Sequence, residues 1–541
     1  MKIKIIKLSK KINKFILVGF LFFNLIGSSQ EWVIRYNGED NLPDGAKAIV
    51  IDRNGNIYVT GASTGRNSFL DIVTIKYRPN GEVCWITRFN GPDNYDDIPA
   101  KLILDKKGNL YITGTTYYRR GMIVESDFVT LKYDTSGNLI WVVFYDGPGS
   151  SYYDYDQAVS LITDSLGNIY VIGQSSGGIS TFLDYALIKY DSLGRTLWVR
   201  RYETEYWDQP WDIILDDSNN IYITGGSGGG GPTHYDYLTL KYSQDGVLLG
   251  AMLYSGPALN FDVARALSLD YQKNIYVTGT SWLSSNGRMG IVTIKYNPEG
   301  RMVWEAIYPD AEAQDILVKG NNIYILGNAI TASGSDILLV KYNSNGSEIW
   351  SQTYNGPVSG DDYGVKIVLD NLENIYLTGI SPGENGNDYV IIKYDSGGQR
   401  LWIRRYDWGN DDNPYDIEID TFNNILITGE SYDTLTSWDY LTIKYSNTSE
   451  IVEKENLISK IDLKIIQELE IIKIEYWLPR KTKMALKFYN PLGKLVKIIS
   501  KIEEKGNHTE YLRKNNLNNG IYLLVLEIPY SKIIKKFPVL K

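Results

Sequence analysis

Four side chains close together in the sequence form its most distinctive chemical group: Tyr206, Trp207, Asp208 and Trp211. Aromatic rings offer flat apolar faces, and a carboxylate beside them accepts hydrogen bonds from hydroxyl groups. This combination is typical of surfaces that bind sugars. The glycine-rich segment 225–231 lacks bulky side chains, which leaves room beside the rings. These four residues are therefore the candidate ligand-binding site.

Other aromatic residues stand at comparable places in the chain and support the same interpretation. The alternative is that each ring packs between elements of the fold, which is the more common role of a single aromatic residue. The further aromatic residues are Tyr95, Tyr152, Tyr153, Tyr155, Phe261, Tyr363, Trp408 and Tyr415.

Aspartates recur in two series that could form acidic rims. One interpretation is a surface that attracts cations; the favoured one is that each carboxylate accepts backbone N–H bonds at the start of a strand, since a residue repeated in every unit usually belongs to the scaffold. The first series comprises Asp44, Asp97, Asp156, Asp208, Asp262, Asp362 and Asp412, with Asp310 slightly displaced. The second comprises Asp71, Asp127, Asp184, Asp236, Asp336, Asp388 and Asp439.

The sequence assigns no catalytic residue, no metal ligand and no cofactor. Cys84 is the sole cysteine, and His234 and His508 are the sole histidines, which excludes a zinc cluster and a disulfide framework. Adjacent carboxylates such as Asp96 and Asp97 do not by themselves define the separation that a glycosidase needs.

The elements that position these residues are predicted by a repeat. A phrase of the type Asn-Ile-Tyr-Val-Thr-Gly recurs eight times, and a Lys-Tyr pair follows each time at a mean period of about 53 residues. The phrases end at Gly61, Gly114, Gly173, Gly225, Gly279, Gly327, Gly379 and Gly429. The lysines are Lys76, Lys132, Lys189, Lys241, Lys295, Lys341, Lys393 and Lys444.

Each unit is expected to form four strands, as at 48–51, 57–60, 71–77 and 83–89 in the first unit. The eighth unit ends near Tyr445 without a fourth strand. Residues 32–36 have the pattern of a fourth strand but precede the first unit. We therefore expect the N-terminal strand to complete the eighth unit, which closes a ring and leaves no open edge. The fold class is all-β: an eight-bladed β-propeller.

The repeated pattern, Asp-x-x-Gly-Asn-Ile-Tyr-x-Thr-Gly followed by Ile-Lys-Tyr and Trp, resembles the SBBP repeat family of bacterial secreted β-propellers over residues 30–445. Residues 474–479, 485–497, 506–508 and 517–526 are expected strands of a second domain. They resemble the type A sorting domain of type IX secretion, which implies a small immunoglobulin-like β-sandwich and contact with that secretion machinery. A plain accessory β-sandwich is the alternative.

The chain ends carry charges opposite to the middle. Six lysines and an apolar run at 15–26 precede small residues, which predicts a signal peptide over 1–29, with an uncleaved anchor as the alternative. The expected domains are then a propeller over 30–446, a linker over 447–459 and the sandwich over 460–541. Residues 30–450 carry 54 acidic against 31 basic side chains, which disfavours nucleic acid.

These patterns favour a secreted or cell-surface binding or scaffold module. The expected ligand is a glycan or an extracellular partner, and the chain is expected to be a monomer without a stable membrane span. A polysaccharide-processing enzyme is the alternative, followed by a redox propeller of the quinone-dependent type, for which the sequence supplies no assignable cofactor pocket.

Overall fold

A computed structural model describes residues 30–149, 154–177, 182–204, 206–228, 235–258, 260–358, 360–446, 463–467, 470–478, 482–490, 494–504, 506–528 and 531–539. The chain divides into two compact units, one that contains the repeats and one that contains the C-terminal segment. Tyr152, Tyr153, His234 and the expected linker lie outside the described residues, as does the expected signal peptide.

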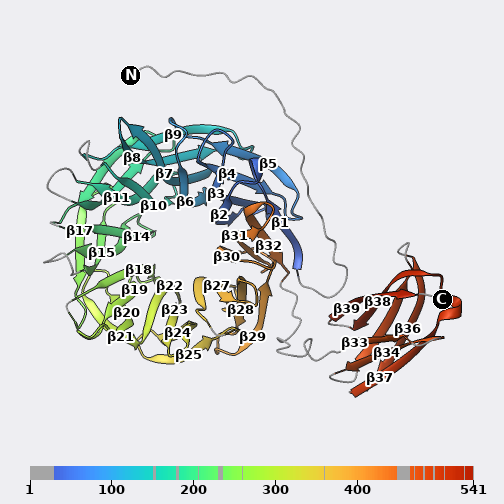
Figure 1. Cartoon of the computed structure of the whole chain (residues 1–541). Helices are drawn as coiled ribbons and strands as arrows, with labels where there is room; N and C mark the ends of the chain where they lie inside the picture. The colour runs from blue at the N-terminus through green and yellow to red at the C-terminus, as the bar shows by residue number, and fades with distance from the viewer. Residues whose placement is uncertain are drawn as a thin grey trace. The chain divides into compact units, whose positions relative to one another are not determined.

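The repeat unit consists of eight four-stranded antiparallel sheets that follow one another around a ring (Figure 1). The first strand of each sheet lies beside the central opening, and the fourth lies on the outside. The sequence prediction of an all-β chain with four strands per unit is thereby confirmed. We number the sheets one to eight in chain order.

Each sheet has a first, second, third and fourth strand, counted from the central opening outward. First strands are β2 (Asp44–Ile51), β6 (Asp97–Leu104), β10 (Asp156–Thr163), β14 (Asp208–Leu215), β18 (Asp262–Leu269), β22 (Ala311–Lys319), β26 (Tyr363–Leu369) and β30 (Asp412–Ile419). Second strands are β3 (Ile57–Thr64), β7 (Leu110–Arg120), β11 (Ile169–Ser176), β15 (Ile221–Gly228), β19 (Ile275–Trp282), β23 (Asn322–Thr331), β27 (Ile375–Pro382) and β31 (Ile425–Asp433). Third strands are β4 (Leu70–Tyr77), β8 (Ile123–Tyr133), β12 (Leu183–Tyr190), β16 (Tyr235–Tyr242), β20 (Met289–Tyr296), β24 (Gly334–Asn343), β28 (Asn387–Tyr394) and β32 (Ser437–Tyr445). Fourth strands are β5 (Val83–Phe89), β9 (Leu139–Tyr145), β13 (Thr196–Tyr202), β17 (Leu248–Tyr254), β21 (Met302–Pro309), β25 (Glu348–Tyr354), β29 (Arg400–Tyr406) and, for sheet eight, β1 (Gln30–Tyr36).

The first strands begin earlier than the sequence predicts because each contains a bulge. In β2 the pairing register with β3 shifts between Ala46 and Ala48, which leaves Lys47 unpaired in the ladder. Gly61 lies opposite the bulge, where a Cβ atom would come within 2.0 Å of the Gly45 carbonyl oxygen. The glycine that ends each repeated phrase is therefore required by the close approach of two backbones.

Neighbouring sheets are tied together by the repeated lysine and tryptophan. Lys132 donates from Nζ to the Ser192 carbonyl oxygen in the next sheet at 2.8 Å, and its ammonium group lies 5.1 Å from the centre of the Tyr111 ring. Trp141 donates from Nε1 to the same carbonyl oxygen at 3.3 Å. The ammonium group at this position therefore contacts a backbone carbonyl oxygen and the face of an aromatic ring.

The ring closes through the N-terminal strand, as the sequence predicts. β1 pairs antiparallel with β32, with Val33 opposite Ile443 and Arg35 opposite Leu441. Trp32 and Ile34 pack against the buried residues that sheets eight and one share. No edge of a third strand is left open at this point. A single-turn 3-10 helix, η1 (Glu39–Asn41), then leads into sheet one.

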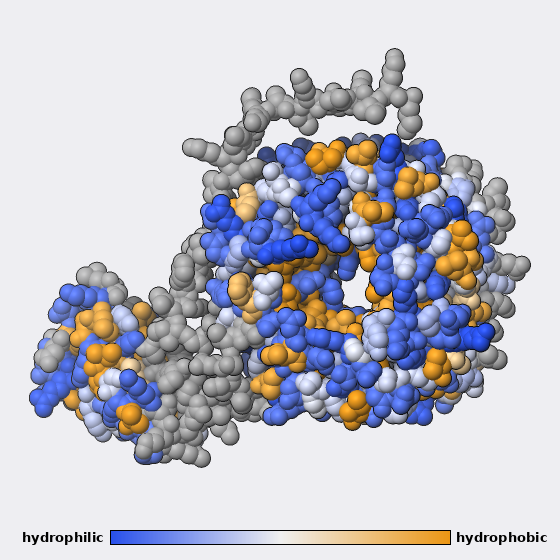
Figure 2. Space-filling view, turned by 180° about the vertical axis from the view of Figure 1, so that it is seen from behind, coloured by the Kyte–Doolittle hydropathy of each residue, from blue (hydrophilic) through white to orange (hydrophobic). Residues whose placement is uncertain are grey.

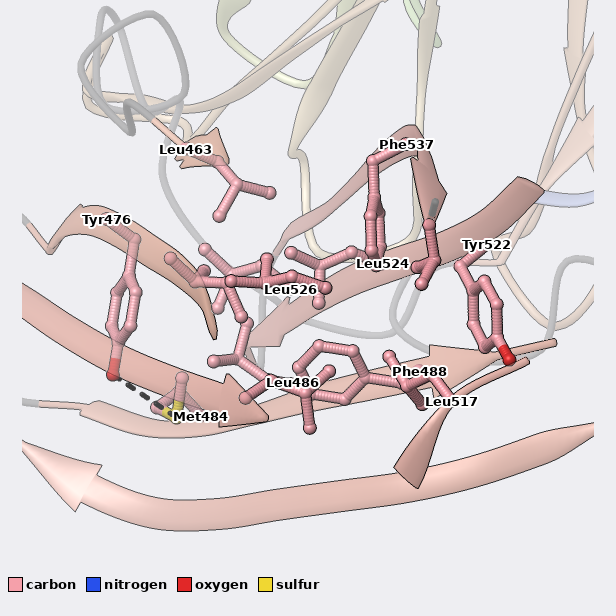
Figure 3. Packing of buried hydrophobic residues seen from close by; sticks show 14 of the residues in the cluster. Leu463, Tyr476, Met484, Leu486, Phe488, Leu517, Tyr522, Leu524, Leu526 and Phe537 are labelled. Carbon is pink, nitrogen blue, oxygen red and sulfur yellow. Dashed lines mark hydrogen bonds between the residues drawn. The ribbon is translucent and has the colours of Figure 1, made fainter. Parts of the chain in front are cut away.

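The C-terminal unit contains a three-stranded and a four-stranded sheet. The first holds β33 (Leu463–Gln467), β34 (Ile471–Leu478) and β37 (Gly506–Arg513); the second holds β36 (Leu495–Glu503), β35 (Thr482–Tyr489), β38 (Gly520–Ile528) and β39 (Ser531–Val539), and η2 (Lys514–Asn516) precedes β38. Ile474 of one sheet and Leu486 and Leu524 of the other share one buried cluster, part of which Figure 3 shows. The expected run 485–497 is two strands, and β33 and β39 were not predicted.

No helix that is long and apolar enough to cross a membrane occurs among the residues that the structure describes.

Candidate functional site

Two kinds of loop meet on one face of the ring. A junction loop leads from the fourth strand of one sheet to the first strand of the next, and a second loop joins strands two and three of each sheet. The two are hydrogen-bonded to one another: the backbone N–H of Gly228 donates to the Trp207 carbonyl oxygen at 2.9 Å, and that of Trp282 donates to Phe261 at 3.2 Å. We call this the loop face.

Trp207 lies in the junction loop before β14 and keeps 45% of its surface exposed. Its ring packs at an angle of 50° against Phe182 of sheet three, with 6.0 Å between the ring centroids. Phe182 is itself exposed. Two apolar rings from neighbouring sheets therefore present their surfaces to solvent side by side, which is an arrangement that can stack on a flat ligand.

Tyr206 and Asp208 hold this loop in place. A Cβ atom on Gly228 would lie 2.4 Å from the Cβ atom of Tyr206, so the glycine makes room for the tyrosine. Asp208 is fully buried and accepts hydrogen bonds from the backbone N–H of Thr204 at 3.1 Å and from the Thr204 hydroxyl at 3.0 Å. Burial raises the pKa of Asp208 to about 6. Its carboxylate thus faces the loop backbone and not solvent.

Trp211 lies at the bulge of β14, between Pro210 and Asp212, and keeps 38% of its surface exposed. The guanidinium carbon of Arg265 in β18 lies 4.4 Å from the centre of its ring. Trp211 therefore belongs to the strand beside the central opening, which Figure 2 shows passing through the ring. Its ring pairs with Arg265, whereas the Trp207 ring pairs with Phe182, so the predicted cluster consists of two aromatic surfaces.

A second cation–ring pair occupies the same repeat position across two other sheets. Lys47, at the bulge of β2, places its ammonium group 4.5 Å from the centre of the Tyr415 ring, at the bulge of β30. The Tyr415 hydroxyl donates to Glu430 at 2.8 Å. Sequence reasoning did not select Lys47 or Arg265. The signal was available, because each stands three residues after an aspartate of the first series.

Members of the first series of aspartates accept backbone N–H bonds at the start of a strand, as favoured from the sequence. Asp97 is buried and accepts the backbone N–H of Gly91 at 2.5 Å, and Asp156 accepts that of Gly147 at 2.6 Å. The adjacent Asp96 accepts the backbone N–H of Leu70 at 3.0 Å. These carboxylates fix the ends of junction loops, and the pair Asp96 and Asp97 is committed to backbone donors.

Two groups of three carboxylates have the spacing to hold a metal ion among the described residues. They are Asp127, Asp146 and Asp156, and Asp388, Asp407 and Asp412. In the second group Arg405 donates to Asp388 at 2.6 Å and so supplies a positive charge within the group. Among the described residues, no lysine or arginine forms an ion pair with any of the three aspartates of the first group.

The ring of repeated antiparallel sheets places the chain in the class of β-propeller-like repeat proteins. The family model "Beta-propeller repeat", SBBP, matches residues 44–69 and 85–117. The model "Secretion system C-terminal sorting domain" matches residues 469–539. Both resemblances drawn from the sequence are confirmed at these residues. The sorting domain indicates handling by type IX secretion and export to the cell surface or beyond.

Individual relatives are distant. An uncharacterized WD repeat-containing protein of Acanthamoeba polyphaga mimivirus is 24% identical over 417 residues, which cover 62% of this chain and 28% of that protein. Among solved structures, a polysaccharide lyase described as an ulvan lyase aligns with 13% identity, a TM-score of 0.36 and coverage of 76% of this chain and 96% of its own. A eukaryotic initiation factor aligns with 8% identity, a TM-score of 0.38 and coverage of 86% and 90%.

Proposed function

We propose that residues 30–446 form an eight-bladed β-propeller, one blade per sheet, that binds a glycan on its loop face outside the cell. The proposal extends to the other parts of the chain. Residues 1–29 are a signal peptide, residues 447–459 a linker, and residues 460–541 an immunoglobulin-like sandwich that the type IX machinery recognises. The chain acts as a monomeric binding module.

The single observation that carries the binding role is the exposure of Trp207 and Trp211. Large aromatic side chains are usually well buried, yet these two keep 45% and 38% of their surface exposed while neighbouring side chains orient them. An oriented and exposed ring loses little conformational entropy when a sugar stacks on it. Tyr206 and Asp208 position the loop and do not contact the sugar with their own polar groups.

The two aromatic surfaces suit different parts of an oligosaccharide. Trp207 with Phe182 offers an apolar platform for the face of one sugar ring. At Trp211 the guanidinium group of Arg265 lies over the ring, and its N–H groups can donate to hydroxyl or carboxylate oxygens of a sugar bound beside it. The ligand class is therefore an extended glycan, whose neighbouring units engage the two surfaces.

A glycan array probed with the full-length chain, followed by calorimetric titration of the best oligosaccharide, tests this function. Each stacked ring contributes on the order of 1 kcal/mol, so Trp207→Ala combined with Trp211→Ala should weaken binding by about tenfold or more. Trp408→Ala is the matched control, because Trp408 is an equally exposed tryptophan but lies in the junction loop before β30, four sheets along the ring from β14. It should leave the affinity within about twofold.

An array without a bound glycan contradicts the proposal. An affinity that is unchanged in the double variant contradicts the assignment of the two tryptophans.

A further inference from the structure

Five carboxylates gather where sheet two meets sheet three. Asp127 lies in β8, Asp146 directly follows β9, and Asp156 opens β10. One carboxylate oxygen from each of these three lies within 4.8 Å of those from the other two. Glu125 and Asp154 lie beside them, because Ser126, which follows Glu125, forms a β-bridge with Tyr155, which lies between Asp154 and Asp156. The cluster thus concentrates oxygen ligands from two strands and the junction loop between β9 and β10.

Two buried members of this cluster have carboxylate oxygens without a donor. Glu125 is 1% exposed, and neither of its oxygens accepts a hydrogen bond in the described part of the chain. Asp154 is 6% exposed, and its Oδ1 has no donor there either. Glu125 forms one ion pair, at 3.3 Å, with the guanidinium of Arg120, whose side chain is exposed. Buried carboxylates without donors are costly unless a cation compensates them.

The same position in other sheets shows what is missing. In sheets one, three, seven and eight, the third-strand aspartate pairs with an arginine of the fourth strand at 2.6–2.7 Å. These pairs are Asp71 with Arg88, Asp184 with Arg201, Asp388 with Arg405, and Asp439 with Arg35. In sheet two, Phe144 of β9 stands opposite Val129, where the arginine would be. Asp127 therefore lacks the positive charge that these four equivalents have, and carboxylate oxygens of Asp146 and Asp156 lie within 4.8 Å of its own.

Fixed donors orient two of the carboxylates. The Tyr118 hydroxyl donates to Oδ1 of Asp127 at 3.0 Å. The backbone N–H of Gly147 donates to Oδ2 of Asp156 at 2.6 Å. Arg201 acts on Asp156 from sheet three, but its guanidinium is paired with Asp184.

We propose that Asp127, Asp146 and Asp156, with Glu125 and Asp154 beside them, bind a calcium ion that joins sheets two and three. Calcium takes six to eight oxygen ligands at about 2.3–2.6 Å, so ligand oxygens on opposite sides of the ion lie about 5 Å apart, which matches the spacing here. The ligands are hard oxygen donors without nitrogen or sulfur. The ion takes the place of the arginine found in the equivalent sheets.

Calorimetric titration of calcium chloride into the full-length chain, stripped of metal with a chelator, tests the proposal. We expect one ion per chain, and tighter binding than magnesium chloride gives in the same experiment. Asp146→Asn should weaken calcium binding about tenfold or more, since affinity follows the number of charged ligands. The Asp146 side chain is exposed, so its replacement leaves the fold intact. Asp407→Asn is the matched control in the arginine-paired cluster and should leave binding unchanged.

A second variant tests the same idea by restoring the missing charge. Phe144→Arg places the arginine of the equivalent sheets beside Asp127. It should abolish calcium binding and raise the melting temperature of the calcium-free chain. The proposal fails if the parent chain shows no saturable calcium binding, if magnesium binds more tightly, if Asp146→Asn or Phe144→Arg binds calcium like the parent, or if Asp407→Asn is the variant that loses it.

Discussion

Arg35 is the residue that fixes the start of the folded chain to its last sheet, and its loss has a calculable cost. Its guanidinium donates to Oδ2 of Asp439 through Nη2 at 2.7 Å and through Nε at 3.2 Å. It also donates to the Ser431 carbonyl oxygen at 3.1 Å and lies 5.0 Å from the centre of the Trp408 ring. The two side chains of the ion pair are 16% and 4% exposed.

Arg35→Met leaves Asp439 buried without its cation. Removing one partner of a buried ion pair costs about 3–5 kcal/mol, and the partial exposure of Arg35 places this case near 3 kcal/mol. Denaturant unfolding of the full-length chain measures the loss. Arg66→Met is the control, because Arg66 pairs with Asp40 at 2.8 Å on the surface, where such a pair contributes less than about 1 kcal/mol.

A loss of unfolding free energy below about 1 kcal/mol for Arg35→Met, or an equal loss in the two variants, would refute the reasoning that a buried ion pair helps β1 to close the ring.

Three further predictions concern closure, export and pH. Deletion of residues 30–37 removes the strand that covers β32, so size-exclusion chromatography should show aggregation, and a monomer with the parent's melting temperature would contradict the ring topology. Removal of residues 447–541 should leave the ring folded but keep the protein inside the cell envelope. Unchanged secretion of the shortened chain would mean that the C-terminal unit is an accessory domain. Burial raises the pKa of Asp44 to about 7 and those of Asp97 and Asp412 to about 6. The folded chain holds these protons at a higher pH than the unfolded chain, so its melting temperature should fall as pH rises from about 4 to about 7, and Asp44→Asn should reduce the slope in thermal melts. A melting temperature that rises over this window would show that other groups dominate.

Most of the ring could be predicted because its determinants are local and repeated. A glycine opposite a bulge, a lysine over a tyrosine ring and a turn after each strand recur in the sequence wherever they recur in the structure. The pairing of β1 with β32 was predictable by the same logic, since a fourth strand was missing from one end and present at the other.

The candidate site was predictable only in part, because it depends on contacts between sheets. Trp207 and Trp211 are close in sequence, yet their rings pair with Phe182 and Arg265 from different sheets. Asp208 was grouped with them by sequence, although its carboxylate is committed to Thr204. Nothing in the local sequence distinguishes a buried acceptor from an exposed one at this position.

The acidic cluster at the second junction was missed for a related reason. Each aspartate fits a repeated structural role by itself, so no metal ligand was assigned from the sequence. The informative departure is Phe144, which replaces an arginine found in four other sheets. The signal in the sequence is therefore a charge that is absent from one unit and present at the equivalent position of four others.

The most direct test of the central claim is a crystal structure of the full-length chain with the best-binding oligosaccharide from the array. We predict a sugar ring stacked on Trp207 beside Phe182, or on Trp211 beside Arg265, with the rest of the oligosaccharide on the loop face. A sugar bound on the opposite face of the ring, or on the C-terminal unit, would contradict the account.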